Sequence, residues 1–219
     1  MDDNFIGFDI ETAPDFAAAE KLWKAPSRLK DPAKIADAKA EYLAEAALSP
    51  LTGRIVIIGL IGIEAMPEYL EGPEKAIIEA FWGTFAANHY AAHRFCFWSG
   101  AGNAGHFDID YLVTRSRILG IPVPATVRNG RFYGSRIVDL ASEFLLNRTG
   151  EYLSLTNAGE IFHLYDEGVT PACTRKRPDD AITGAGFAMA YVNGATRQAA
   201  LDYLANDLHL VYHLARAIL

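Results

Sequence analysis

Short apolar runs alternate with amphipathic stretches along most of this chain, a pattern that predicts alternating strands and helices. Residues 4–10 alternate in polarity and are rich in Phe and Ile, which indicates a first strand. Further apolar runs predict strands at residues 54–62, with a short partner around 64–70, and at 94–98 and 137–140. All of these runs are well below the roughly 18 consecutive apolar residues of a membrane span, so we expect no membrane association.

Helical periodicity separates these runs. Within residues 74–92, apolar side chains recur at the spacing of one helix face, which predicts a helix packed on a core. The same spacing predicts helices at residues 106–119, 153–164 and 196–219.

Residues 15–48 differ from the rest because alanine, lysine and glutamate dominate them. Pro32 stands where a helix over residues 33–47 would begin. We therefore expect a helical insertion between the first two strands of an α/β domain with a mixed sheet flanked by helices. We take residues 1–219 as a single domain.

Composition and charge narrow the possible functions. The chain has 219 residues and a net charge of −7, which disfavours broad electrostatic capture of duplex nucleic acid but not phosphate binding through metal ions. Its first residues are acidic and do not resemble a secretory signal, so we expect a cytoplasmic protein. Cys96 and Cys173 are far apart and indicate neither a disulfide framework nor a zinc site.

Gly100, Gly102 and Gly105 spell G-x-G-x-x-G between a predicted strand and a predicted helix, as in a dinucleotide site. However, residues 120–133 contain no acid that could bind the ribose. Asp108 also brings negative charge to the helix start, where a pyrophosphate would need positive charge. We therefore interpret the glycines as a strand-to-helix turn and expect no nicotinamide or flavin cofactor.

Asp9 and Glu11 are two residues apart in the first strand, so their side chains project from the same face. Two adjacent carboxylates repel each other unless a cation neutralises them. Mg²⁺ and Mn²⁺ take such oxygen ligands, which makes a divalent cation site one interpretation. The alternative is that the pair marks the solvated end of a strand.

Tyr203 and Asp207 share one face of the last predicted helix at positions i and i+4. They are either part of a site or boundary residues beside the apolar stripe. His209 and His213 have the same spacing, but without a recognisable third ligand we do not expect zinc there. Asp139 is expected to cap a helix.

Taken in order, the segments FDIET, NAGHFDIDYL and YLANDLHLVYHL resemble the DEDD superfamily of 3′-to-5′ exonucleases over about residues 4–216. Tyr203, four residues before Asp207, is similar to the tyrosine-bearing (DEDDy) subgroup; the histidine-bearing subgroup would have His where Asp202 stands. The chain as a whole is similar to the proofreading exonuclease domain of family-B DNA polymerases, standing alone.

The resemblance implies a ribonuclease-H-like fold and an enzyme that releases nucleoside 5′-monophosphates from the 3′ end of single-stranded DNA or RNA. Two divalent cations, Mg²⁺ or Mn²⁺, would bind the scissile phosphate. By the family pattern, Asp9 would contact both ions, Glu11 and Asp207 would complete the first, and Asp108 would hold the second. Tyr203 would orient the attacking water.

The resemblance also implies substrate contacts. Thr12 would lie near the terminal 3′-hydroxyl, and Asn103 and Phe107 would approach the last nucleotides, although Phe107 fits an ordinary core position equally well. A basic side chain would contact the strand's backbone, supplied by one of four arginines: Arg115, Arg117, Arg128 or Arg131.

Two other functions remain open: a catalytically silent relative that binds nucleic acid or protein, and a metal-dependent phosphatase of small molecules. Residues 166–184 carry no motif that we can assign. Substrate sugar, preferred metal, protein partners and oligomeric state are not determined by these patterns.

Overall fold

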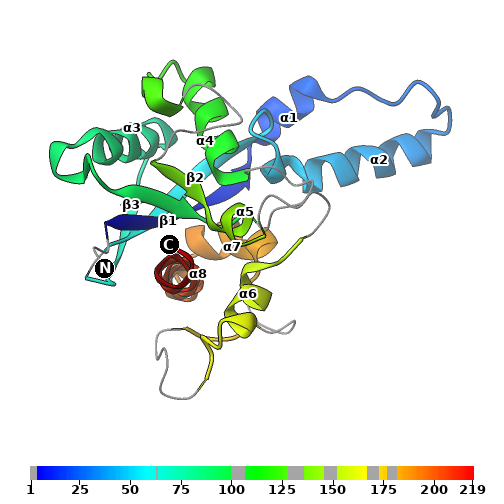
Figure 1. Ribbon diagram of the computed structural model, residues 1–219. Coiled ribbons are helices and arrows are strands. Elements are labelled where there is room, and N and C mark those ends of the chain that lie inside the picture. Colours follow the sequence, from blue (N-terminus) through cyan, green and yellow to red (C-terminus); the bar gives the residue numbers. More distant parts are fainter. Residues whose placement is uncertain are drawn as a thin grey trace.

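The computed structural model describes residues 4–62, 64–99, 107–127, 136–145, 152–166, 173–176 and 182–219. Its centre is a five-stranded sheet in the order β3-β2-β1-β4-β5 (Figure 1). The strands are β1 (Phe5–Pro14), β2 (Gly53–Ile61), β3 (Pro67–Glu71), β4 (Arg94–Phe97) and β5 (Ile137–Asp139).

The sheet is mixed, as predicted. β1 pairs antiparallel with β2 and parallel with β4, so this strand is central. β2 pairs antiparallel with β3, and β4 pairs parallel with β5. With helices on both faces, this α/β architecture is of the ribonuclease-H-like type.

Two separate cores lie on the two faces of the sheet. α3 (Glu74–Ala86) and α4 (Phe107–Ile118) cover one face, which we call the α4 face, and α8 (Arg197–Ile218) covers the other, the α8 face (Figure 1). Shorter helices also pack on the α8 face: α5 (Leu140–Phe144), α6 (Leu155–Ile161) and α7 (Phe187–Val192). Short 3₁₀ turns occupy Ala46–Leu48, Asn88–Tyr90, Ala125–Val127 and Gly184–Gly186.

The alternation of side chains along β1 decides which face receives which residue. Phe8 and Ile10 enter the core of the α4 face, whereas Phe5 and Ala13 enter that of the α8 face. Residues at odd positions of β1 thus point toward α8.

Glycines let α8 lie close to the strands beneath it. A Cβ at Gly59 would be 2.6 Å from Leu208 Cδ1, and one at Gly7 would be 3.1 Å from Val211 Cγ1. Both distances are shorter than most packing contacts, so a larger residue at either position would require these side chains of α8 to shift. The approach sets how near a side chain of α8 comes to the odd-numbered residues of β1.

The predicted insertion is present as a helical arm, residues 15–48, between β1 and β2. It consists of α1 (Phe16–Leu22), a loop over residues 23–31, α2 (Pro32–Ala44) and a 3₁₀ turn, and it projects beyond the sheet (Figure 1). Asp31 caps α2 by accepting a hydrogen bond from the Ala33 N–H, and Pro32 starts the helix as predicted. α2 contains no buried residue.

Some boundaries differ from those that periodicity predicts. β1 continues to Pro14 instead of ending at residue 10, because β2 pairs with it beyond a bulge after Glu11. The helix predicted to reach residue 92 ends at Ala86, and α7 was not predicted. In the part of the chain that the structure describes, no helix has the length and apolarity needed to cross a bilayer.

Candidate metal centre

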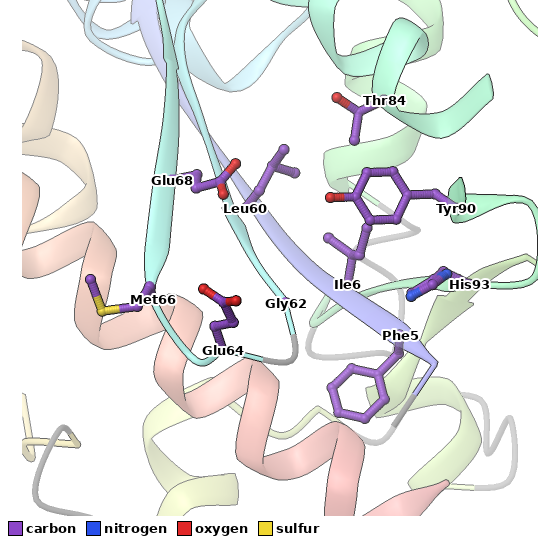
Figure 2. Close-up of a pocket in the computed structure, with 10 residues that line it drawn as sticks. All are labelled: Phe5, Ile6, Leu60, Gly62, Glu64, Met66, Glu68, Thr84, Tyr90 and His93. Atoms are coloured by element: carbon purple, nitrogen blue, oxygen red, sulfur yellow. The ribbon is translucent and has the colours of Figure 1, made fainter. Parts of the chain in front are cut away.

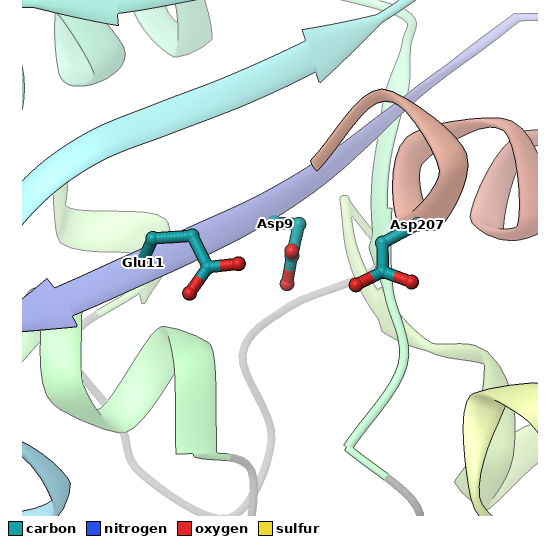
Figure 3. A group of neighbouring side chains, drawn as sticks. All are labelled: Asp9, Glu11 and Asp207. Carbon is teal, nitrogen blue, oxygen red and sulfur yellow. The ribbon is translucent and has the colours of Figure 1, made fainter. Parts of the chain in front are cut away.

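Three carboxylates converge between β1 and α8. Asp9 and Glu11 project from the α8 face of β1, and Asp207 projects toward them from α8 (Figure 3). One oxygen from each carboxylate lies within 4.8 Å of the others. Glu11 and Asp207 are buried, and Asp9 is half-buried. Residues almost 200 positions apart in the chain thus form one acidic cluster.

Burial and mutual repulsion raise the pKa values in this cluster. The pKa of Asp9 rises to about 7, first because burial removes water from the carboxylate and then because Asp207 is close. The pKa of Glu11 rises for the same reasons, with Asp9 as its strongest charged neighbour. Burial also raises the pKa of Asp207. Full ionisation of the cluster at neutral pH therefore needs additional positive charge.

The donor set fits a hard divalent cation. Every candidate ligand atom is a carboxylate oxygen, the type that Mg²⁺ and Mn²⁺ bind. Asp207 Oδ1 is buried and has no hydrogen-bond partner among the described residues. A buried polar atom without a partner is costly, and a cation ligated by it would remove that cost.

Asp108 stands at the edge of this cluster. It lies in the first turn of α4, and its side chain is buried. Burial raises its pKa, and Asp9 is the charged group that raises it most. It does not belong to the group whose oxygens lie within 4.8 Å of one another. The structure therefore brings Asp108 near Asp9 but at a larger separation than Glu11 and Asp207.

Tyr203 lies one helical turn before Asp207 on α8 and faces the acidic cluster. Burial raises the pKa of its hydroxyl, and Asp207, Glu11 and Asp9 raise it further. The hydroxyl therefore stays protonated at neutral pH. It can donate a hydrogen bond but cannot act as a base.

Lys176 is a member of the site that the sequence did not indicate. Its Nζ lies 2.5 Å from Asp207 Oδ2 and 3.3 Å from the centroid of the Tyr203 ring. Its charge lowers the pKa values of Asp9, Glu11 and Asp207, partly opposing the effect of burial. No signal in the sequence indicated Lys176, because it is a single lysine in a segment without periodicity or a recognisable motif.

Asn206 holds the segment that carries Lys176 against α8. Its Oδ1 accepts a hydrogen bond of 2.6 Å from the Thr174 N–H and lies 3.2 Å from Thr174 Oγ1. Asn206 is itself buried beside Asp207. The two adjacent residues of α8 therefore fix both the backbone near Lys176 and its ammonium group.

The predicted substrate contacts have different surroundings. The Thr12 hydroxyl donates to the Ala47 carbonyl at 3.0 Å, at the base of the arm. Phe107 is half-buried at the start of α4, with its ring centroid 5.2 Å from that of Tyr111. Asn103, like the glycines at positions 100, 102 and 105, lies outside the described residues. Roles for these residues in binding substrate stay predictions.

Arg115 is one of the four arginines predicted as possible contacts to the backbone of the substrate strand. The structure excludes it from that role. Its guanidinium forms a two-pronged ion pair with Glu74, at 2.8 and 2.6 Å, and donates to the Pro50 carbonyl. The side chain is only 7% exposed. Arg117 is exposed, whereas Arg128 and Arg131 lie outside the described residues.

The prediction that Asp139 caps a helix is confirmed. Asp139 caps α5 by accepting a hydrogen bond from the Ala141 N–H. Both cysteines are buried and free. His209 and His213 belong to no metal-spaced group in the described part of the chain.

A separate pocket of about 310 Å³ lies near the start of β1 and is lined by Phe5, Glu64, Glu68 and His93, among others (Figure 2). Its two glutamates and the histidine do not come close enough together to form a metal-spaced group within the described residues. None of the three clustered carboxylates lines it. The acidic cluster is therefore the better candidate for a reactive centre.

Comparison with known proteins gives a fold relationship. No protein-family model and no curated protein matches the chain. Among solved structures, it is similar to a family B DNA polymerase from the hyperthermophilic archaeon Pyrobaculum calidifontis, with a TM-score of 0.57 and 18% identity. The match covers 97% of this chain and 24% of the polymerase chain, so this protein corresponds in length to about a quarter of that enzyme. At this identity the two chains share a fold.

Proposed function

We propose that this chain is a metal-dependent 3′-to-5′ exonuclease of the tyrosine-bearing DEDD subgroup. It would release nucleoside 5′-monophosphates from the 3′ end of single-stranded DNA or RNA. The observation that carries the proposal is the convergence of Asp9, Glu11 and Asp207 within 4.8 Å, on the fold that a family B DNA polymerase chain shares.

Asp9, Glu11 and Asp207 would hold one divalent cation, and Asp108 together with Asp9 would hold a second. When bound, Mg²⁺ or Mn²⁺ supplies positive charge for the scissile phosphate and makes a bound water more acidic. The four carboxylates keep the site anionic so that it binds these cations.

The remaining residues position the reactants. Tyr203, whose hydroxyl stays protonated, would donate a hydrogen bond that orients the attacking water. Lys176, whose Nζ contacts Asp207, would supply positive charge for the negative charge that develops on the phosphate as the bond breaks. Phe107 and Thr12 would lie along the last nucleotides of the strand.

Incubation of 5′-labelled DNA and RNA oligonucleotides with the purified protein tests this function. Shortening by one nucleotide at a time in Mg²⁺ or Mn²⁺, abolished by EDTA and by Asp9→Asn, is the expected result. Asp202→Asn is the matched control, because Asp202 is an exposed acid on the same helix that accepts a hydrogen bond from Gln198 and is not one of the clustered carboxylates. Internal cleavage, or full activity of Asp9→Asn, would contradict the proposal.

A further inference from the structure

The loop of the helical arm and the helix ends that flank it concentrate positive charge in an acidic protein. Residues 21–34 contain five basic side chains and one acid, a net charge of +4 within a chain of net charge −7. The five are Lys21, Lys24, Arg28, Lys30 and Lys34. All are exposed, and none forms an ion pair with a carboxylate of the described part of the chain. Asp31, the one acid, is occupied as the cap of α2.

Folding alone does not account for this charge. Unpaired like charges repel one another, and no residue of α2 is buried against the rest of the protein. Packing between the Trp23 and Tyr42 rings, with centroids 5.2 Å apart, instead joins the two sides of the arm. The arm is therefore a projection stabilised by its own contacts, and it exposes its lysine and arginine side chains to solvent.

The base of the arm is next to the acidic cluster. α1 directly follows β1, the strand that carries Asp9 and Glu11. The Ala47 carbonyl lies where the chain returns from the arm toward β2. It accepts hydrogen bonds from Thr12 and from Tyr111 of α4, the helix that contains Asp108 in its first turn. The arm thus extends outward from the point where β1 and the start of α4 meet.

We propose that the loop of the arm binds the phosphodiester backbone of the substrate strand several nucleotides before its 3′ end. This inference rests on the proposed exonuclease function. A strand whose 3′ end lies at the anionic cluster needs positive charge elsewhere to be retained, and the arm provides it. The 13 residues of α2 span about 20 Å, so a single strand must extend over several nucleotides to pass from the cluster to the loop.

Fluorescence anisotropy with labelled dT20, rU20 and dT2 tests the arm independently of catalysis, in the Asp9→Asn background with Mg²⁺. The variant Lys24→Glu/Arg28→Glu/Lys30→Glu should weaken binding of the 20-mers by roughly 10- to 100-fold. The slope of log K against log salt should become shallower by about 2, since each lost contact to a single strand contributes about 0.7. Binding of dT2, whose single phosphodiester cannot extend from the cluster to the loop, should change little.

A comparison of two single substitutions tests the proposal even if the triple variant misfolds. Arg28→Glu and the control Lys75→Glu change the net charge equally, and Lys75 is exposed on α3, outside the arm. Arg28→Glu should weaken binding of the 20-mers several-fold and Lys75→Glu should not. If the arm variants lower the affinity for only one of dT20 and rU20, the result supports the proposal for that polymer.

Unchanged affinity of the arm variants, equal effects of Arg28→Glu and Lys75→Glu, or no binding by the parent protein would overturn the proposal. These outcomes differ from failure of the proposed function. Arm-dependent binding by a protein without stepwise cleavage would overturn only the exonuclease activity. Stepwise cleavage with arm-independent binding would overturn only the role of the arm.

Discussion

Two buried ionic clusters lie on opposite faces of the sheet and differ in how their charges are balanced. On the α4 face, Arg115 and Glu74 form a two-pronged pair, and the Ile55 N–H adds a hydrogen bond of 2.8 Å to the carboxylate. On the α8 face, Asp9, Glu11 and Asp207 have Lys176 as their cation, with Asp108 close by.

The difference separates a structural ion pair from a candidate reactive centre. The Arg115–Glu74 pair has equal and opposite charges and satisfied hydrogen-bonding groups, so removing either partner would leave an uncompensated buried charge. In the acidic cluster the carboxylates outnumber the cation, and their pKa values rise as a result. Such unbalanced, buried titratable groups are typical of sites where a ligand completes the charge.

The largest expected contrast is in stability. Arg115→Met should lower the free energy of unfolding by about 3–5 kcal/mol, because it leaves Glu74 buried and unpaired. Asp9→Asn should instead raise it in the metal-free protein at pH 8, by on the order of 1 kcal/mol, because it removes a repelling charge. Urea denaturation in EDTA measures both. Shifts of the two variants in the same direction would show that the clusters do not differ in charge balance.

A second expected contrast is in pH dependence. The pKa of Asp9 is about 7 in the folded protein but near 4 in an unfolded chain, so the folded state holds more protons between these values. The stability of the metal-free protein should therefore fall by a few kcal/mol as the pH rises from about 4 to about 7. Thermal unfolding with and without Mg²⁺ measures this, and saturating Mg²⁺ should restore stability at pH 8. A pH profile that Mg²⁺ leaves unchanged would argue against a cation site.

Two tyrosines provide a matched comparison of the faces. Tyr203→Phe should slow stepwise hydrolysis by roughly 10- to 100-fold, since it removes the donor that we propose for the attacking water, while largely sparing metal binding. Tyr111→Phe removes a hydroxyl that donates to Ala47, so it should cost about 1 kcal/mol of stability and leave kcat unchanged. Single-turnover assays and isothermal titration with Mn²⁺ distinguish these outcomes. Equal rates for parent and Tyr203→Phe would remove Tyr203 from the mechanism.

The smallest expected effect concerns the hold on Lys176. Asn206→Ala removes the acceptor for Thr174 and should loosen the segment that carries Lys176, at a cost of about 1 kcal/mol in stability. The expected signature is a drop in kcat of several-fold with little change in KM, and Asn206→Asp, which keeps an acceptor oxygen, should recover part of it. A rate unaffected by Asn206→Ala would show that the segment is held by other contacts.

Periodicity predicted most of the fold because it reflects local geometry. The strands, the long terminal helix and the insertion follow from alternation, helical spacing and proline placement. The extension of β1 to Pro14 was missed because pairing with β2, not the residues themselves, keeps those positions extended. α7 is short, with six residues, and so offers too little periodicity to predict.

The sequence by itself determined which elements form, and it placed Asp9 and Glu11 on one face of a strand and Tyr203 and Asp207 on one face of a helix. Only the tertiary structure decided which charges meet. The close approach of α8 places Asp207 beside Asp9 and Glu11, and Lys176 forms an ion pair with Asp207. Arg115 is instead buried in an ion pair with Glu74. The physical reason is that periodicity depends on a residue's immediate neighbours, whereas Coulomb interactions and desolvation depend on distances that packing creates between segments far apart in the chain.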